Sequence, residues 1–185
     1  MRTLVDTGVY GEYLHYGMPL TLVTVRGNNG QVNVSTNASI TPLPGDHLRL
    51  AIGIFTENLT NQLIAESKEF VVNVISDDMR GVAKLCGEHS GADTDKLALC
   101  DLTLAPSAEI GTPLIAECPL NIECRVESVH HLDDLDLWIA EILAIQVAQD
   151  WSDGRSGVDL QRYNPLLYTF GYTLARGPMV GAGSL

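Results

Sequence analysis

Short strand-type segments recur along this chain, and their spacing limits the folds that the chain can adopt. Apolar or alternating runs occupy residues 20–25, 48–54, 70–75, 118–129 and 137–147. The intervals between them are too short and too irregular for repeated strand–helix–strand units. The pattern therefore predicts six or seven mainly antiparallel strands that form a closed β-barrel, with two or three short helices inserted between them.

Turn and capping residues indicate how these segments connect. Gly27-Asn28-Asn29-Gly30 predicts a hairpin turn, because Asn and Gly tolerate positive φ, so residues 20–25 and 31–36 should pair. Thr60 is a candidate N-cap of a first helix, and Asp77 or Asp78 of a second one that runs through Leu85. Lys96–Leu99 is expected to form a further helical turn.

The stretch Gln31–Thr41 begins as a strand and then fills with short polar side chains, before Pro42 and Pro44 end it. Such a strand has little to bury, and its backbone can be approached closely. Two interpretations follow from these residues. The stretch is either a polar edge strand or a surface that offers short donors and acceptors to a flat polar ligand.

Length and composition predict one domain over residues 1–185. A chain of 185 residues with 45% hydrophobic residues can fill one core, and it contains no repeat or evident linker. Residues 1–17, rich in Tyr and Gly, are expected to form an N-terminal arm, and the Gly- and Pro-containing residues 177–185 a loose tail.

The charge of the chain limits its partners. A net charge of −12 disfavours nucleic acid and anionic membrane surfaces, because no basic stripe is present to neutralise phosphates. Neither a signal-peptide pattern nor an apolar run of transmembrane length occurs, so a cytoplasmic location is expected. An anionic ligand would have to be held by local groups.

Two segments could carry chemistry. The segment at residues 130–136 (HHLDDLD) resembles a metal site, but adjacent histidines on a strand point to opposite sides, so a solvated hairpin turn is the favoured interpretation. Ser90–Lys96 (SGADTDK) combines a hydroxyl, a glycine and a lysine ahead of a helical turn. This segment is either an anion-binding loop or an exposed capping loop. No metal site is predicted.

Five segments in order resemble the flavin reductase-like, FMN-binding split-barrel family, most closely its flavoredoxin branch. They are Pro19–Thr24 (PLTLVT), Asn33–Ser39 (NVSTNAS), Glu69–Val74 (EFVVNV), Ser90–Lys96 and Ile115–Cys124 (IAECPLNIEC). The resemblance runs from about Tyr16 to Asp150 and continues more weakly to Tyr172. Leu97 stands where many relatives have Phe, and residues 57–59 lack an arginine that many carry.

The resemblance implies a split, antiparallel Greek-key β-barrel that forms a homodimer and binds FMN in a groove at the subunit interface. The implied FMN-binding residues are Asn33, Ser35, Thr36, Asn37, Ala38, Ser39, Thr60, Ser90, Gly91 and Lys96. The aromatic residues 163–172 are expected to supply part of the dimer interface.

The implied activity is an oxidoreductase that passes electrons from NAD(P)H through FMN to a flavin, a ferric chelate or a redox protein. Because the flavin carries the chemistry, no catalytic side chain is expected. The alternatives are a non-catalytic FMN-binding electron-transfer protein and a barrel without a ligand. The four cysteines are expected to be reduced, with Cys118 and Cys124, which match family positions, favoured as packing residues over redox thiols.

Overall fold

The structure is a computed structural model that describes residues 17–154, 157–159, 165–169 and 172–174. Apart from Gly17, the predicted arm at 1–17 and tail at 177–185 lie outside the described residues, as do Tyr163 and Phe170. The strands are β1 (Met18–Pro19), β2 (Thr21–Arg26), β3 (Val32–Asn37), β4 (Ile40–Leu43), β5 (Arg49–Phe55), β6 (Glu69–Val74), β7 (Leu104–Ala105), β8 (Leu114–Ile115), β9 (Leu120–Leu132), β10 (Leu135–Val147), β11 (Leu167–Thr169) and β12 (Tyr172–Leu174). The helices are α2 (Leu59–Ser67), α3 (Arg80–Glu88) and α4 (Lys96–Leu99), with 3₁₀ turns at Asp77–Met79 and Gln149–Trp151.

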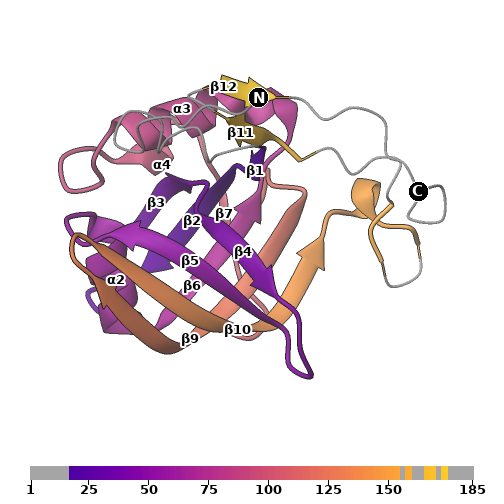
Figure 1. Cartoon of the computed structure of the whole chain (residues 1–185). Helices are drawn as coiled ribbons and strands as arrows, with labels where there is room; N and C mark the ends of the chain where they lie inside the picture. Colours follow the sequence, from indigo (N-terminus) through magenta and orange to yellow (C-terminus); the bar gives the residue numbers. More distant parts are fainter. Residues whose placement is uncertain (1–16, 155–156, 160–164, 170–171, 175–185) are drawn as a thin grey trace, which may run out of the picture.

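The main sheet has seven antiparallel strands in the order β3-β2-β6-β9-β10-β5-β4 (Figure 1). Its edge strands, β3 and β4, are joined by only Ala38 and Ser39. Three peptide steps span at most about 11 Å, so the two edges must come together at this point. The sheet therefore curls into a barrel.

The barrel is split and not closed, because β3 and β4 form no ladder with each other. The fold implied by the family resemblance is confirmed, whereas the closed barrel predicted from strand spacing alone is corrected. The β5–β6 connection, which contains α2, joins strands that are separated by β9 and β10 in the sheet, as expected for a Greek-key arrangement.

Two hydrophobic cores lie on opposite faces of β2. Val23 and Val25 pack inside the barrel, together with Ile64 of α2 and Phe70 of β6. On the outer face, Leu22 packs with residues of α3 and the segment after it. This double burial explains the continuous apolar run of β2. The helix α3 crosses the top of the barrel beside β3 (Figure 1).

Several local predictions need correction. The stretch Gln31–Thr41 divides at residues 38–39 into β3 and β4, and Pro42 lies within β4, which is possible because an edge strand tolerates a missing N–H. Asn58, not Thr60, is the N-cap of α2. Asp77 and Asp78 belong to a 3₁₀ turn that precedes α3 and do not cap α3.

The helix α2 is fixed to the barrel by a buried polar contact. The Asn61 side chain donates to Asp136 Oδ2 at 2.7 Å and accepts the Trp138 indole N–H at 2.7 Å. All three side chains are buried, so these hydrogen bonds offset the loss of hydration. The contact sets the position of the first turn of α2 against β10 and, with it, the position of Thr60.

Candidate functional site

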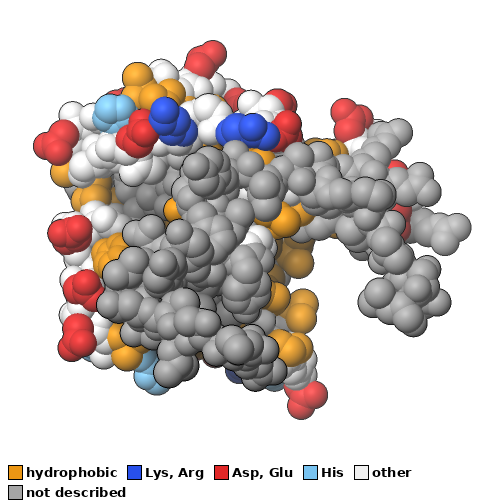
Figure 2. Space-filling view, turned by 45° about the horizontal axis from the view of Figure 1, so that its top comes forward, with side chains coloured by type: hydrophobic (Ala, Val, Ile, Leu, Met, Phe, Trp, Pro, Cys, Tyr) orange, Lys and Arg blue, Asp and Glu red, His pale blue; other side chains and the backbone are white. Residues whose placement is uncertain are grey.

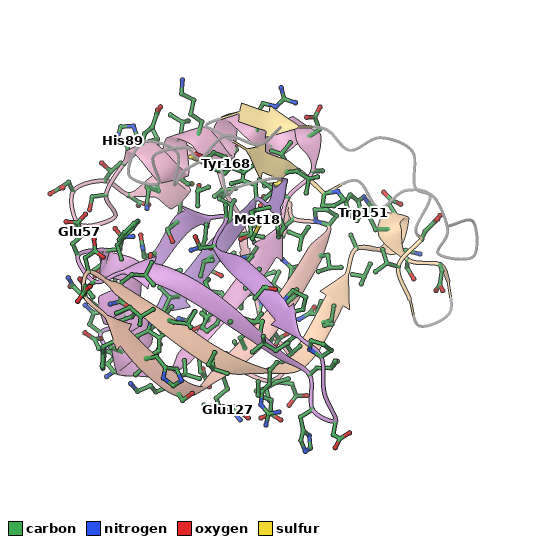
Figure 3. The ribbon with its side chains drawn as sticks, in the orientation of Figure 1. Met18, Glu57, His89, Glu127, Trp151 and Tyr168 are labelled. Carbon is green, nitrogen blue, oxygen red and sulfur yellow. The ribbon has the colours of Figure 1, made fainter. Side chains whose placement is uncertain are left out.

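A cavity of about 370 Å³ lies between β3, the start of α2 and the segment that leads from the end of α3 to α4. Its lining is mainly polar: Asn33, Ser35, Thr36, Glu57, Asn58, Leu59, Thr60, Cys86, Gly87, Glu88, His89, Ser90, Gly91 and Lys96. Glu57 and His89 belong to two different parts of this lining, and Figure 3 labels both. The cavity follows from the split, because none of the described strands pairs with β3 on this side.

Short side chains of β3 and α2 form a hydrogen-bonded chain in the wall of the cavity. The Asn33 amide donates to Thr60 Oγ1 at 2.9 Å, and the Thr60 hydroxyl donates to Ser35 Oγ at 2.8 Å. Asn33 and Thr60 are buried. The chain joins the edge strand to the helix and presents hydroxyl and amide groups to the cavity.

A second hydrogen bond fixes the opposite wall. The Thr36 hydroxyl donates to the carbonyl oxygen of Ala83 at 2.5 Å, which holds α3 against β3. Near the end of α3, a Cβ added at Gly87 would lie 3.5 Å from Thr36 Cβ, an ordinary contact distance. The end of α3 therefore packs closely against the polar edge of the strand.

Gly91 allows the loop after α3 to approach β3. A Cβ added at Gly91 would lie 1.9 Å from Asn33 Oδ1 and 3.2 Å from a methyl group of Leu59. Only glycine fits this backbone position without displacing the buried Asn33. The preceding residue, Ser90, accepts the Ala92 N–H through its hydroxyl and the Asp93 and Thr94 N–H groups through its carbonyl oxygen. The loop is thereby held in one conformation.

Lys96 places a buried amine in the cavity. The residue is only 4% exposed, and within the described part of the chain its amine donates one hydrogen bond, to the Cys86 carbonyl oxygen, 3.3 Å from Nζ. Burial lowers the pKa of Lys96, although the neighbouring thiols of Cys86 and Cys100 act in the opposite direction. An ammonium group has three donors, so this one retains donors for an anion.

The negative charge of the surroundings means that an anionic ligand would need this amine. Acidic side chains lie around the edge of the face shown in Figure 2, consistent with the net charge of −12, and Glu57 and Glu88 line the cavity itself. An anionic ligand would therefore depend on local donors.

The structure brings seven of the ten predicted site residues into this cavity: Asn33, Ser35, Thr36, Thr60, Ser90, Gly91 and Lys96. Asn37, Ala38 and Ser39 do not line it. Asn37 donates to the Gly53 carbonyl oxygen and accepts the Ser39 N–H, and Ala38 packs against the outer core. These three residues hold the β3–β4 link together, and a flavin contact for any of the ten stays a prediction.

The sequence interpretation missed two parts of the lining. Residues 57–59 enter the cavity because the chain passes it just before α2 begins, and Cys86–His89 enter it at the end of α3. The second part had a usable signal, because a helix predicted to end near Leu85 leads directly into the loop at Ser90.

Two further hollows adjoin the cavity. One, of about 480 Å³, lies on the other side of Gly91 and Lys96, between β3 and residues 92–97. The other, of about 630 Å³, follows α3 and shares Thr36, Gly87 and Glu88 with the cavity. Tyr168, labelled in Figure 3, lines its far side.

The HHLDDLD segment spans the solvated hairpin turn that was expected, because residues 130–134 are exposed and only Asp136 of the segment is buried. The turn contains only Asp133 and Asp134, whereas His131 and Asp136 belong to the paired strands β9 and β10. His131 Nδ1 lies 2.6 Å from Asp136 Oδ1, and the hydrogen bond from Asn61 is the main cause that lowers the pKa of Asp136. The described residues contain no group of three or more His, Cys, Asp or Glu that could hold a metal ion.

Comparison with known proteins identifies the family. A family model described as "Flavin reductase like domain" matches residues 13–173. The chain belongs to the flavin reductase-like family. An uncharacterized protein of Archaeoglobus fulgidus is 31% identical over 146 residues, which cover 79% of this chain and 82% of that protein. The NADH:riboflavin 5'-phosphate oxidoreductase of Streptomyces pristinaespiralis is 30% identical over 122 residues, or 64% of this chain and 65% of that enzyme.

A solved structure supports the same assignment for this flavin reductase-like protein. The flavoredoxin of Methanosarcina acetivorans has a TM-score of 0.88 and 25% sequence identity, covering 98% of this chain and 95% of that one. The resemblance to this family and to its flavoredoxin branch is therefore confirmed. Within the described residues, no helix is long and apolar enough to span a membrane.

The close approach at Gly91 generates a stability prediction. Gly91→Ala should lower the free energy of unfolding by about 1–3 kcal/mol, because the new methyl group must displace Asn33 from its hydrogen bond with Thr60. Chemical denaturation measures the change.

Gly81→Ala is the matched control, because Gly81 belongs to the helix α3 and a Cβ added there would meet no atom within 4 Å. This control should raise the stability by about 0.5–1 kcal/mol. Equal effects of both substitutions would contradict the assigned role of Gly91.

Proposed function

We propose that this protein is an FMN-binding oxidoreductase that takes electrons from NAD(P)H and passes them to a flavin, a ferric chelate or a redox protein. The observation that carries the proposal is the polar cavity beside β3, with the buried Lys96 amine in its wall. Membership of the flavin reductase-like family supports a flavin as the ligand, and the name of the Streptomyces relative, in which riboflavin 5'-phosphate is FMN, supports this particular flavin.

The donor set fits a phosphorylated flavin. The phosphate of FMN is a strong acceptor, and Lys96 has donors to spare in a protein that is otherwise strongly acidic. Ser90 and the backbone around Gly91 would support Lys96 at this end. The hydroxyl groups of Ser35, Thr36 and Thr60 would face the polar edge of the ring system.

The protein would bind and orient, whereas the flavin supplies hydride and electron transfer when it is bound. The chain from Asn33 through Thr60 to Ser35 fixes the orientation of its hydroxyl groups in advance, so they need no rearrangement to meet a ligand. The bond from Thr36 to Ala83 keeps α3 in place as the wall of the cavity. No acidic or basic side chain is required to move a proton.

Anaerobic reduction tests the proposed activity. The protein, loaded with FMN and mixed with NADH or NADPH under argon, should lose the yellow absorbance of oxidised flavin faster than free FMN does under the same conditions. Reoxidation with added riboflavin, ferric citrate or a ferredoxin then compares the acceptors. No acceleration with either nicotinamide would contradict the reductase.

The similarity to a flavoredoxin favours a second candidate, an FMN-binding electron-transfer protein without a nicotinamide site. In this case, the loaded protein would not react with NADH or NADPH but would still be reduced by a small redox protein or by dithionite. The same anaerobic experiment therefore distinguishes the two candidates.

We also propose a homodimer as the working unit. Large apolar side chains are exposed on neighbouring parts of the barrel, with Leu48 58% and Ile145 49% exposed. Leu48 is hydrogen-bonded to Ile142 of the strand that carries Ile145. Sedimentation should give about twice the chain mass of 20.0 kDa. A monomer at micromolar concentration would contradict the dimer.

Lys96 provides the sharpest test of the binding mode. Lys96→Met should raise the Kd for FMN about tenfold, because the side chain keeps its length but loses a charge-assisted contact. For riboflavin, which lacks the phosphate, the variant and the wild type should have similar Kd values. Lys84→Met removes an exposed cation from α3 and should leave both affinities nearly unchanged.

The pKa of Lys96 adds a pH dependence. Because burial lowers this pKa, the charge is lost at a lower pH than in an exposed lysine. The FMN affinity of the wild type should therefore fall as the pH rises through the lowered value, and the Lys96→Met variant should lack this fall. Fluorescence titrations over a pH series measure both. If the affinity for riboflavin fell with rising pH as much as the affinity for FMN, this result would contradict the placement of Lys96 beside the phosphate.

A further inference from the structure

Two of the four cysteines form a close pair beside the cavity. The Sγ atoms of Cys86 and Cys100 are 3.8 Å apart. Cys86 lies in the last turns of α3 and is 1% exposed, whereas Cys100 follows α4 and is partly exposed. The family resemblance assigns no role to this pair of thiols, although Cys86 itself lines the cavity.

The other two cysteines differ. Cys118 lies 3.8 Å from Met79 Sδ in the outer core, and Cys124 contacts the Ile122 carbonyl oxygen in the barrel core. Both are buried, which raises their pKa values and keeps them as thiols. This supports their predicted packing role. The Met79 thioether cannot form a disulfide with Cys118, whereas the thiols of Cys86 and Cys100 are in contact with each other, so these two are the pair placed for redox chemistry.

The pair encloses a functional segment of the chain. The residues between Cys86 and Cys100 include Ser90, Gly91 and Lys96, all of which line the cavity. Lys96 also interacts electrostatically with both sulfur atoms. A covalent bond between the two cysteines would close this segment into a loop and limit its motion.

We propose that Cys86 and Cys100 are a redox-active dithiol, which a hydroperoxide oxidises to a disulfide that closes the cavity-lining segment into a covalent loop. The proposal goes beyond the oxidoreductase activity and does not depend on it, because no flavin takes part in the reaction.

The reaction balances with hydrogen peroxide as the oxidant. Cys100, the more exposed thiol, loses its proton and attacks a peroxide oxygen, so that an S–O bond forms, the O–O bond breaks and water leaves. Cys86 Sγ then attacks Cys100 Sγ, the S–S bond forms, and the hydroxyl group leaves as a second water with the proton of Cys86. Two thiols and one peroxide give one disulfide and two waters.

The local geometry suits both steps. A disulfide needs its sulfur atoms about 2.05 Å apart, so the pair has less than about 2 Å to close. Cys100 is the C-cap of the four-residue helix α4, whereas Cys86 lies within the nine-residue helix α3, so a shift of Cys100 disturbs fewer helical hydrogen bonds. Burial raises the pKa of Cys86 to about 12, and the adjacent Lys96 ammonium opposes this rise. Cys86 therefore suits the second step, in which it attacks within the protein, better than the first.

Mass spectrometry of the full chain tests the proposal. The reduced protein is treated with stoichiometric hydrogen peroxide, unfolded, and alkylated with N-ethylmaleimide. Wild-type protein should become lighter by about 2 Da before alkylation and should then take up two labels instead of four. Dithiothreitol should restore all four labels.

Peptide mapping identifies the bond. Trypsin cuts after Lys84 and Lys96, and a protease that cuts before Asp separates Cys100 from Asp101 and the later cysteines. The proposal predicts a cross-linked product of residues 85–92 and 97–100. Any other pairing, or sulfinic acid without a cross-link, would overturn the proposal.

Variants provide the controls. Peroxide treatment should not lower the number of labels that the Cys100→Ser variant takes up. The Cys118→Ala variant, which lacks a cysteine outside the pair, should still take up two labels fewer after the treatment. Circular dichroism shows that each variant is folded. If Cys118→Ala failed to fold, Cys124→Ala would serve the same purpose. Two labels lost from folded Cys100→Ser would contradict the assignment, and so would four labels retained by the wild type.

Discussion

Two residues, Ala38 and Ser39, join strands at opposite edges of a seven-stranded sheet, and this short link determines most of the architecture. It forces the sheet to curl, yet it leaves β3 and β4 without a ladder between them. One edge of β3 is therefore free to meet side chains and helices. The hydrogen bonds of Asn37 with Gly53 and Ser39 hold the link in place.

The split is filled by polar contacts in place of a hydrophobic seam. Asn33, Thr60 and Ser35 connect β3 to α2, and Thr36 connects the same strand to α3. Buried groups of this kind are stable only when they are paired, which fixes the walls of the cavity. The Lys96 amine is the exception, with one acceptor at 3.3 Å among the described residues. This combination of fixed walls and a cation with free donors is suited to an anionic ligand.

Local sequence signals predicted much of this fold. The Gly27–Gly30 turn, in which Gly30 has φ +84°, and the long β9–β10 hairpin follow directly from turn chemistry and alternation. Contacts between distant segments were not predictable in this way. Thr60 is a residue type that favours N-caps, but it is buried against Asn33. Asp136 is part of the β10 ladder, where Asn61 of the distant helix α2 donates to its side chain. Asn37–Ser39 share the composition of the cavity residues, although their place in the β3–β4 link depends on the curl of the whole sheet.

We propose that the cavity beside β3 holds FMN. An NMR titration of the isotopically labelled protein with FMN tests it directly, residue by residue. If FMN binds there, the amide signals of Ser35, Thr36, Gly91 and Lys96 should shift and saturate at one FMN per chain, while those of Asp133 and Asp134, in the β9–β10 hairpin turn, should stay in place. Saturable shifts confined to other parts of the barrel, or no shifts at all, would contradict it.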